Sequence, residues 1–121
     1  MHRVAVAGGR LAGDMPTGHV TQFMKADVER LINGATHAAL MASENGAPVA
    51  ADGLVVAISC AGRRHMLGAH VEEEIEAVSA TLRSDRMRIS GLYAYGEISP
   101  GPDGPCQLHN QALSLMIVTE S

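Results

Sequence analysis

The stretch from Leu54 to Gly68, LVVAISCAGRRHMLG, most strongly constrains how this chain can fold. It opens with five consecutive apolar residues and then changes abruptly to polar and small ones. A continuous apolar run of this length predicts a strand covered on both faces, so we expect Leu54, Val56 and Ile58 to be nearly fully buried. The residues between them should be covered by an opposite layer. The polar residues at 59–65 then follow the carboxyl end of a strand, where open α/β sheets bind ligands.

Two segments have the spacing of amphipathic helices. In the first, apolar residues recur every three or four positions from Val28 to Ala42, directly after Asp27, which can cap a helix. The second is expected from about Ala69 to Arg83, and its glutamates at 72, 73, 74 and 76 are expected to form a solvated face. Residues 61–68, between the central strand and this helix, are expected to be a loop.

Further strands are expected at 3–7, 89–97 and 108–119, the last of them in the interior of the sheet. Because a helix connects the strands at 53–60 and 89–97, these two strands should be parallel. The last two strands, joined by a proline-rich and glycine-rich loop, should be antiparallel. The predicted fold is therefore α+β, a single-domain mixed β-sheet with two packed helices, one parallel crossover and an antiparallel C-terminal hairpin.

Composition excludes several classes of partner. The 121 residues suffice for one domain. Aromatic residues make up 2% of the chain and the net charge is -4, which argues against nucleic-acid binding by stacking or by a basic surface. No apolar stretch approaches the ~18 residues of a membrane span. Two cysteines without a secretory hydrophobic region predict a cytoplasmic protein.

Polar side chains from three separate segments should meet at one edge of the predicted sheet. Two parallel strands end there, and the antiparallel strand begins there, so residues half a chain apart can line one crevice. The histidines other than His109 show no metal-ligand spacing, and we expect no metal site. The candidate ligand-binding residues are Cys60, Arg63, Arg64, Tyr95, Glu97, His109 and Asn110.

Each of these candidates also has a structural interpretation. Cys60 is either a buried structural cysteine or a thiolate activated by a nearby cation. Arg63 either pairs with Glu97 and joins two strands or recognises a carboxylate or phosphate group. His109 and Asn110 are adjacent on a strand and point to opposite faces, which weakens the hypothesis of a Cys-His-Asn hydrolase.

Three motifs resemble the C-terminal half of FIST domains, named for F-box and intracellular signal transduction. They are SCAGR at 59–63, YGEI at 95–98 and LHNQ at 108–111, and the resemblance extends from about residue 11 to 119. It implies a sensory domain that binds small ligands, with amino acids as proposed ligands, and that acts with signalling kinases or cyclic-dinucleotide enzymes. Some members are similar to haem-based nitric-oxide sensors. Ala94 and Ala112 stand where the family commonly has threonine.

We therefore expect residues 1–121 to form a single FIST C-terminal-like domain, without the N-terminal half of the family. Its expected role is a non-catalytic sensory domain that binds a small-molecule ligand, an amino acid or another small carboxylate, and acts with a signalling protein. No cofactor is expected from the residues themselves, and haem is implied by the resemblance alone. Two alternatives stay open: a cysteine-dependent enzyme that uses Cys60 with His109, and a structural or assembly module without a ligand. An uncovered apolar face or strand edge further predicts a homodimer.

Overall fold

The computed structural model describes residues 5–7, 10–12, 16–21, 25–44, 52–83, 85–100 and 104–119. Within these ranges no helix has the length and apolar character needed to cross a membrane. The chain begins with an antiparallel ribbon of two short strands, β1 (Ala5–Ala7) and β2 (Arg10–Ala12). The expected strand at 3–7 thus corresponds to β1, and residues 3 and 4 lie outside the described part.

The central sheet contains three strands in the order β4-β3-β7. Its middle strand is β3 (Gly53–Cys60), as predicted, with β4 (Met87–Ala94) parallel on one side and β7 (Leu113–Thr119) antiparallel on the other. The mixed sheet and its parallel crossover confirm the predicted fold class. The last strand was expected in the interior of the sheet, and this was wrong, because β7 has a strand neighbour only on its β3 side among the described residues.

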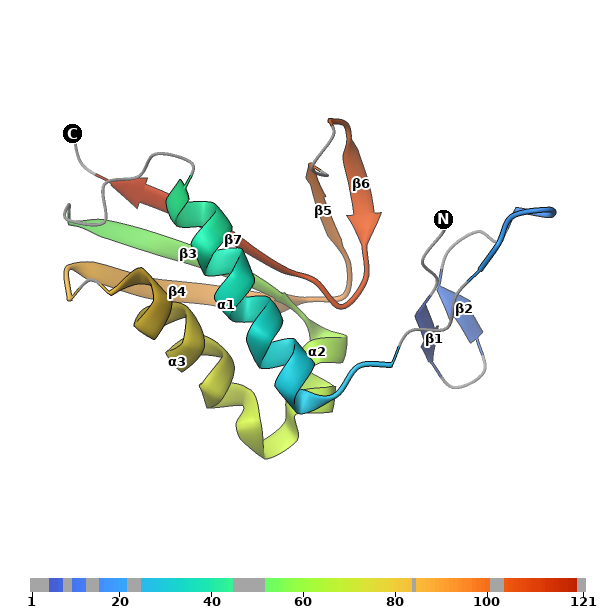
Figure 1. The fold of residues 1–121 in the computed structure, drawn as a ribbon, viewed down its shortest axis with the longest axis horizontal. Coiled ribbons are helices and arrows are strands. Elements are labelled where there is room, and N and C mark those ends of the chain that lie inside the picture. The colour runs from blue at the N-terminus through green and yellow to red at the C-terminus, as the bar shows by residue number, and fades with distance from the viewer. Residues whose placement is uncertain are drawn as a thin grey trace.

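A separate ribbon forms the antiparallel hairpin near the C-terminus. It pairs β5 (Glu97–Pro100) with β6 (Cys106–His109) and projects away from the sheet beyond the carboxyl end of β3 (Figure 1). Each of the strands expected at 89–97 and 108–119 is therefore divided in two. The ribbon leaves the sheet where β4 ends and returns to it where β7 begins.

The first helix, α1 (Val28–Glu44), confirms the amphipathic pattern. Its start is fixed by Asp27, whose Oδ1 accepts a hydrogen bond of 2.9 Å from the Arg30 N–H. The segment after β3 was expected to be a loop, and this was wrong, because α2 (Ala61–Leu67) begins immediately after Cys60. Five of the seven residues of α2 are good helix formers, and Gly68 ends it with a φ of 55°. The helices η1 (Gly68–His70) and α3 (Val71–Leu82) follow.

Both long helices lie on the same side of the sheet (Figure 1). The core between the layers contains Ala35 and Ala39 of α1, Val55 of β3, and Val78 and Leu82 of α3. Alanine at two core positions of α1 lets this helix approach α3 and the sheet closely, since no larger side chain separates them. The core is accordingly aliphatic and has one helical layer.

The opposite face of the sheet is largely exposed, which corrects the expectation that β3 is covered on both faces. Alternate residues of β3 point to opposite faces, and the helices bury Val55 and Ala57 while Leu54 is 40% exposed and Val56 and Ile58 are only half-buried. Two helices form only one covering layer, so an apolar strand can still have an exposed side. We call this the open sheet face; its residues are Leu54, Val56, Ile58, Arg88, Ser90, Leu92, Ser114, Met116 and Val118.

Candidate functional site

The strand register brings the three predicted segments to one end of the sheet. Cys60, the last residue of β3, is paired with Ala94 at the end of β4, and Ser59 is paired with Leu113 at the start of β7. The Cys60 N–H also donates a hydrogen bond of 3.1 Å to the carbonyl of Ala112. The first turn of α2, the start of β5 and the end of β6 therefore surround the carboxyl end of β3.

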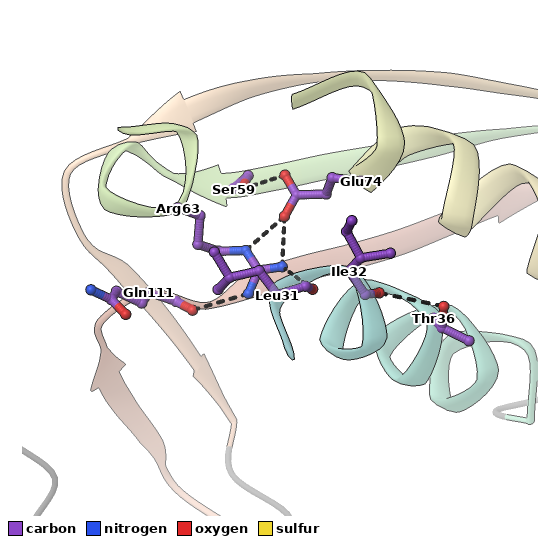
Figure 2. A network of polar contacts seen from close by, with 7 residues as sticks. All are labelled: Leu31, Ile32, Thr36, Ser59, Arg63, Glu74 and Gln111. Atoms are coloured by element: carbon purple, nitrogen blue, oxygen red, sulfur yellow. Dashed lines mark hydrogen bonds and ion pairs between the residues drawn. The ribbon is translucent and has the colours of Figure 1, made fainter. Parts of the chain in front are cut away.

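At this end of the sheet Arg63 forms a buried ion pair with Glu74 (Figure 2). The Arg63 Nε donates to Glu74 Oε1 at 2.7 Å, and Nη2 lies 2.6 Å from the same oxygen. Both side chains are buried among the core elements. The expected pairing of Arg63 with Glu97 was therefore wrong, since Glu74 of α3 takes that place.

The remaining contacts of this ion pair connect it to three further parts of the chain. Arg63 donates to the carbonyl of Leu31 in α1 at 2.8 Å and to that of Gln111 before β7 at 3.3 Å, while the hydroxyl of Ser59 donates to Glu74 Oε2 at 3.0 Å (Figure 2). A buried charge that is paired and hydrogen-bonded in this way holds the elements around it in one arrangement. These contacts place the Arg63 side chain in the core, where its guanidinium binds groups of the protein itself.

The acidic run of α3 was expected to form a solvated helix face. This prediction was wrong for Glu74, which is fully buried. A sequence signal for this exists: Glu74 lies three residues after Val71 and four before the buried Val78, and so shares their helix face. A charged residue on the apolar stripe of a helix requires a buried partner, and Arg63 supplies it.

The carboxylate of Glu97, at the start of β5, has no such partner. Its side chain is 4% exposed, and within the described part of the chain neither carboxylate oxygen has a hydrogen-bond partner. Leaving a buried polar group unpaired costs roughly 1–3 kcal/mol, and more if it is charged. Glu97 is therefore the residue at this end of the sheet whose chemistry the fold leaves unsatisfied.

The β5–β6 ribbon turns its polar face toward the protein and its apolar face toward solvent. Glu97 is paired with His109, so their side chains lie on the same face of the ribbon, and both are at least partly buried. The His109 Nε2 donates to the carbonyl of Ser99 at 3.2 Å, which fixes the ring beside Glu97. On the other face Ile98 and Leu108 are paired and exposed. This orientation is the reverse of an ordinary amphipathic ribbon.

The other predicted site residues divide between the interior and the surface. Cys60 is buried at the end of β3, and both it and the exposed Cys106 are free thiols. Tyr95 is 97% exposed, and Asn110 is also exposed. Arg64 is exposed as well, with its guanidinium 5.1 Å from the ring centre of Tyr93, a cation–π contact. These surface residues are not enclosed with Glu97.

The cleft between α1 and the η1–α3 segment does not fit a haem group. This cleft has a volume of about 470 Å³, and it contains a histidine, His70, whose Nδ1 lies 2.6 Å from Glu73. Its apolar lining is limited to Val28 and Ile32, beside two glutamates, which is too little to cover the faces of a porphyrin. No three His, Cys, Asp or Glu side chains in the described ranges are placed to hold a metal ion.

The family model of the FIST C domain matches residues 5–100 of this chain, which include the SCAGR and YGEI motifs, while the LHNQ motif lies beyond it. Searches of curated proteins and of solved structures found no match. The matched part contains β3, α2, α3 and the buried Glu97, and it covers most of the chain. The chain belongs to the FIST C domain family.

Proposed function

We propose that this chain is a sensory domain that binds a small molecule carrying a protonated amino group, and that the Glu97 carboxylate contacts this group. FIST C domains are sensory domains of signal transduction. The observation that carries the proposal is the buried carboxylate without a hydrogen-bond partner in the described structure. That carboxylate needs hydrogen-bond donors and a positive charge. An ammonium group supplies both, because it has three N–H donors and one positive charge.

The surroundings of Glu97 support the same ligand class. His109 is held beside it on the inward face of the ribbon, where the imidazole offers its second nitrogen to a polar ligand group. Gly96 and Ile98, on either side of Glu97, are exposed, so the backbone reaches the surface at the point where the carboxylate turns inward. An amino acid meets these requirements, and its carboxylate would contact groups other than Arg63.

A binding role is favoured over a cysteine-dependent enzyme by one contact of His109. The Nε2 of His109 is bonded to the carbonyl of Ser99, which removes that nitrogen from activating a thiol. In this proposal the ligand-bound domain acts on a signalling protein. Its two free thiols agree with a location in the reducing cytoplasm.

The test is a thermal-shift screen followed by calorimetry. Its probes are the twenty common amino acids, short primary amines, and the N-acetylated form of each, which lacks the positive charge. Binding of an ammonium compound should raise the melting temperature of the native protein, because a ligand that binds only the folded state stabilises it. The acetylated form of the same compound should have no effect.

Glu97→Gln should abolish that response, while Glu76→Gln, at an exposed position of α3, should leave it unchanged. The two variants make the same change of charge, so the comparison isolates the buried site. Equal responses of native protein and Glu97→Gln to an ammonium compound would overturn the proposal. So would a screen in which neutral acetylated compounds stabilise the protein as well as the amines do.

A further inference from the structure

The open sheet face is exposed and largely apolar. Leu92 and Met116 are 59% and 58% exposed, and Leu54 and Val118 are also exposed. Arg88 is its one charged side chain among the described residues, and it lies at a corner, beside Leu54 on the outer strand β4. Contiguous apolar patches of this kind mark interaction sites. We propose that the open sheet face packs against the same face of a second copy of this chain, about a two-fold axis parallel to β3.

The register of the three strands makes the face complementary to itself. Beside Val56, the small Ser90 of β4 lies on one side and the large Met116 of β7 on the other. Beside Ile58 the order is reversed, with the large Leu92 on β4 and the small Ser114 on β7. Small and large side chains therefore alternate between the two sides of β3.

A two-fold axis parallel to β3 exchanges the two sides and preserves the position along the strand. Ser90 of one copy then faces Met116 of the other, and Leu92 faces Ser114, so each large side chain meets a small one. Two aligned sheets that pack face to face interdigitate in this way across roughly 10 Å. The two copies of Arg88 lie at opposite edges, where each guanidinium keeps its contact with water.

The size of the face agrees with a weak, reversible dimer. Three strands spaced about 4.8 Å apart, with up to eight residues that each rise about 3.3 Å, span roughly 14 Å by 26 Å. Two such faces, with the side chains that project from them, bury on the order of 1,000 Å² of accessible surface, near the lower limit of specific interfaces. A partner of opposite charge would find no charge pattern to match on this face, whereas a second copy fits its shape.

The first test is sedimentation equilibrium of the full chain over a wide concentration range. The native protein should dimerise, and Met116→Glu should raise the dissociation constant at least ~100-fold, because it places an unpaired charge in an apolar interface. Met41→Glu is the matched control: Met41 is 48% exposed and lies on α1, on the far side of the molecule, so this variant should dimerise normally. A native protein that is monomeric at all concentrations overturns the proposal.

The second test examines the axis, and it also covers the case in which Met116→Glu does not fold. Ser90→Met should crowd two methionines, and Met116→Ser should leave two serines facing each other, so each change alone should weaken the dimer. The two changes together restore one large and one small side chain at each contact, and the dissociation constant should return to within about tenfold of the native value. Additive effects, or a tighter dimer in Ser90→Met, would overturn the two-fold packing.

Discussion

Arg63 and Glu74 are eleven residues apart in the sequence, and their side chains meet in the core with Nη2 of the arginine 2.6 Å from Oε1 of the glutamate. The pair lies where α1, α2, α3 and β3 come together. Removing one partner would leave the other as an uncompensated buried charge, whereas removing both leaves none.

Glu74→Gln and Arg63→Met should therefore each lower the free energy of unfolding by about 3–5 kcal/mol. The double variant Arg63→Met/Glu74→Gln should be more stable than either single one, since the pair then leaves no buried charge. Urea unfolding followed by circular dichroism measures all three, with the exposed Glu76→Gln as control. Strictly additive losses would show that the two side chains are not coupled.

The two faces of β3 should respond differently to truncation. Val55 is fully buried under the helices, and Val55→Ala should lower the free energy of unfolding by about 2 kcal/mol through the cavity it leaves. Leu54→Ala removes more atoms but from an exposed position, so at protein concentrations where the chain is monomeric its cost should stay below about 1 kcal/mol. A larger loss of stability for Leu54→Ala than for Val55→Ala in urea unfolding would contradict this assignment of the buried face of β3.

Gly91 permits the close approach of β4 to β3. A Cβ atom at this position would lie 1.9 Å from the carbonyl oxygen of Ala57, and a backbone atom cannot move aside as a side chain can. Gly91→Ala should therefore lower the melting temperature, and it should lower the free energy of unfolding measured in urea by about 1–3 kcal/mol.

Gly62→Ala is the matched control for Gly91→Ala. Its new Cβ would lie 3.5 Å from the Cys60 Sγ, an ordinary contact, within α2. Alanine is a better helix former than glycine by about 1 kcal/mol, so this variant should be slightly more stable than the native protein. Loss of stability in both variants would instead indicate general intolerance of added volume at this end of the sheet.

Glu97→Met should stabilise the protein in the absence of ligand. Methionine has a similar length and needs no hydrogen bonds, so the unfavourable burial of an unpaired carboxylate disappears, and the free energy of unfolding should rise by about 1–2 kcal/mol. Thermal melting in ligand-free buffer measures this. A less stable Glu97→Met would mean that the carboxylate is already satisfied in the folded protein.

The elements that were predicted correctly have local signals. The apolar run of β3, the stripe of α1 and the cap at Asp27 each depend on residues close in sequence. The face of β3 that is buried could not be read from the same run, because both sets of alternate residues are apolar and only the position of the helices distinguishes them.

The end of the sheet at which these residues lie was predictable, but the ion pair that forms there was not. The strand order implied that Arg63 and Glu97 would lie at the same end of the sheet. Which carboxylate reaches Arg63 depends on how α3 packs beside α2, and that packing is a tertiary contact without a local signal. The unsatisfied state of Glu97 follows from the same packing, since Glu74 occupies the guanidinium.

The β5–β6 ribbon is attached to the sheet by two short connections, residues 95–96 after β4 and residues 110–112 before β7. In the second of these Gln111 adopts a φ of 56°, a conformation that a non-glycine residue rarely takes. Because the connections lead to the two outer strands on either side of β3, the ribbon is joined to both edges of the sheet. A ligand that contacts Glu97 would therefore act at a point linked through the backbone to both outer strands.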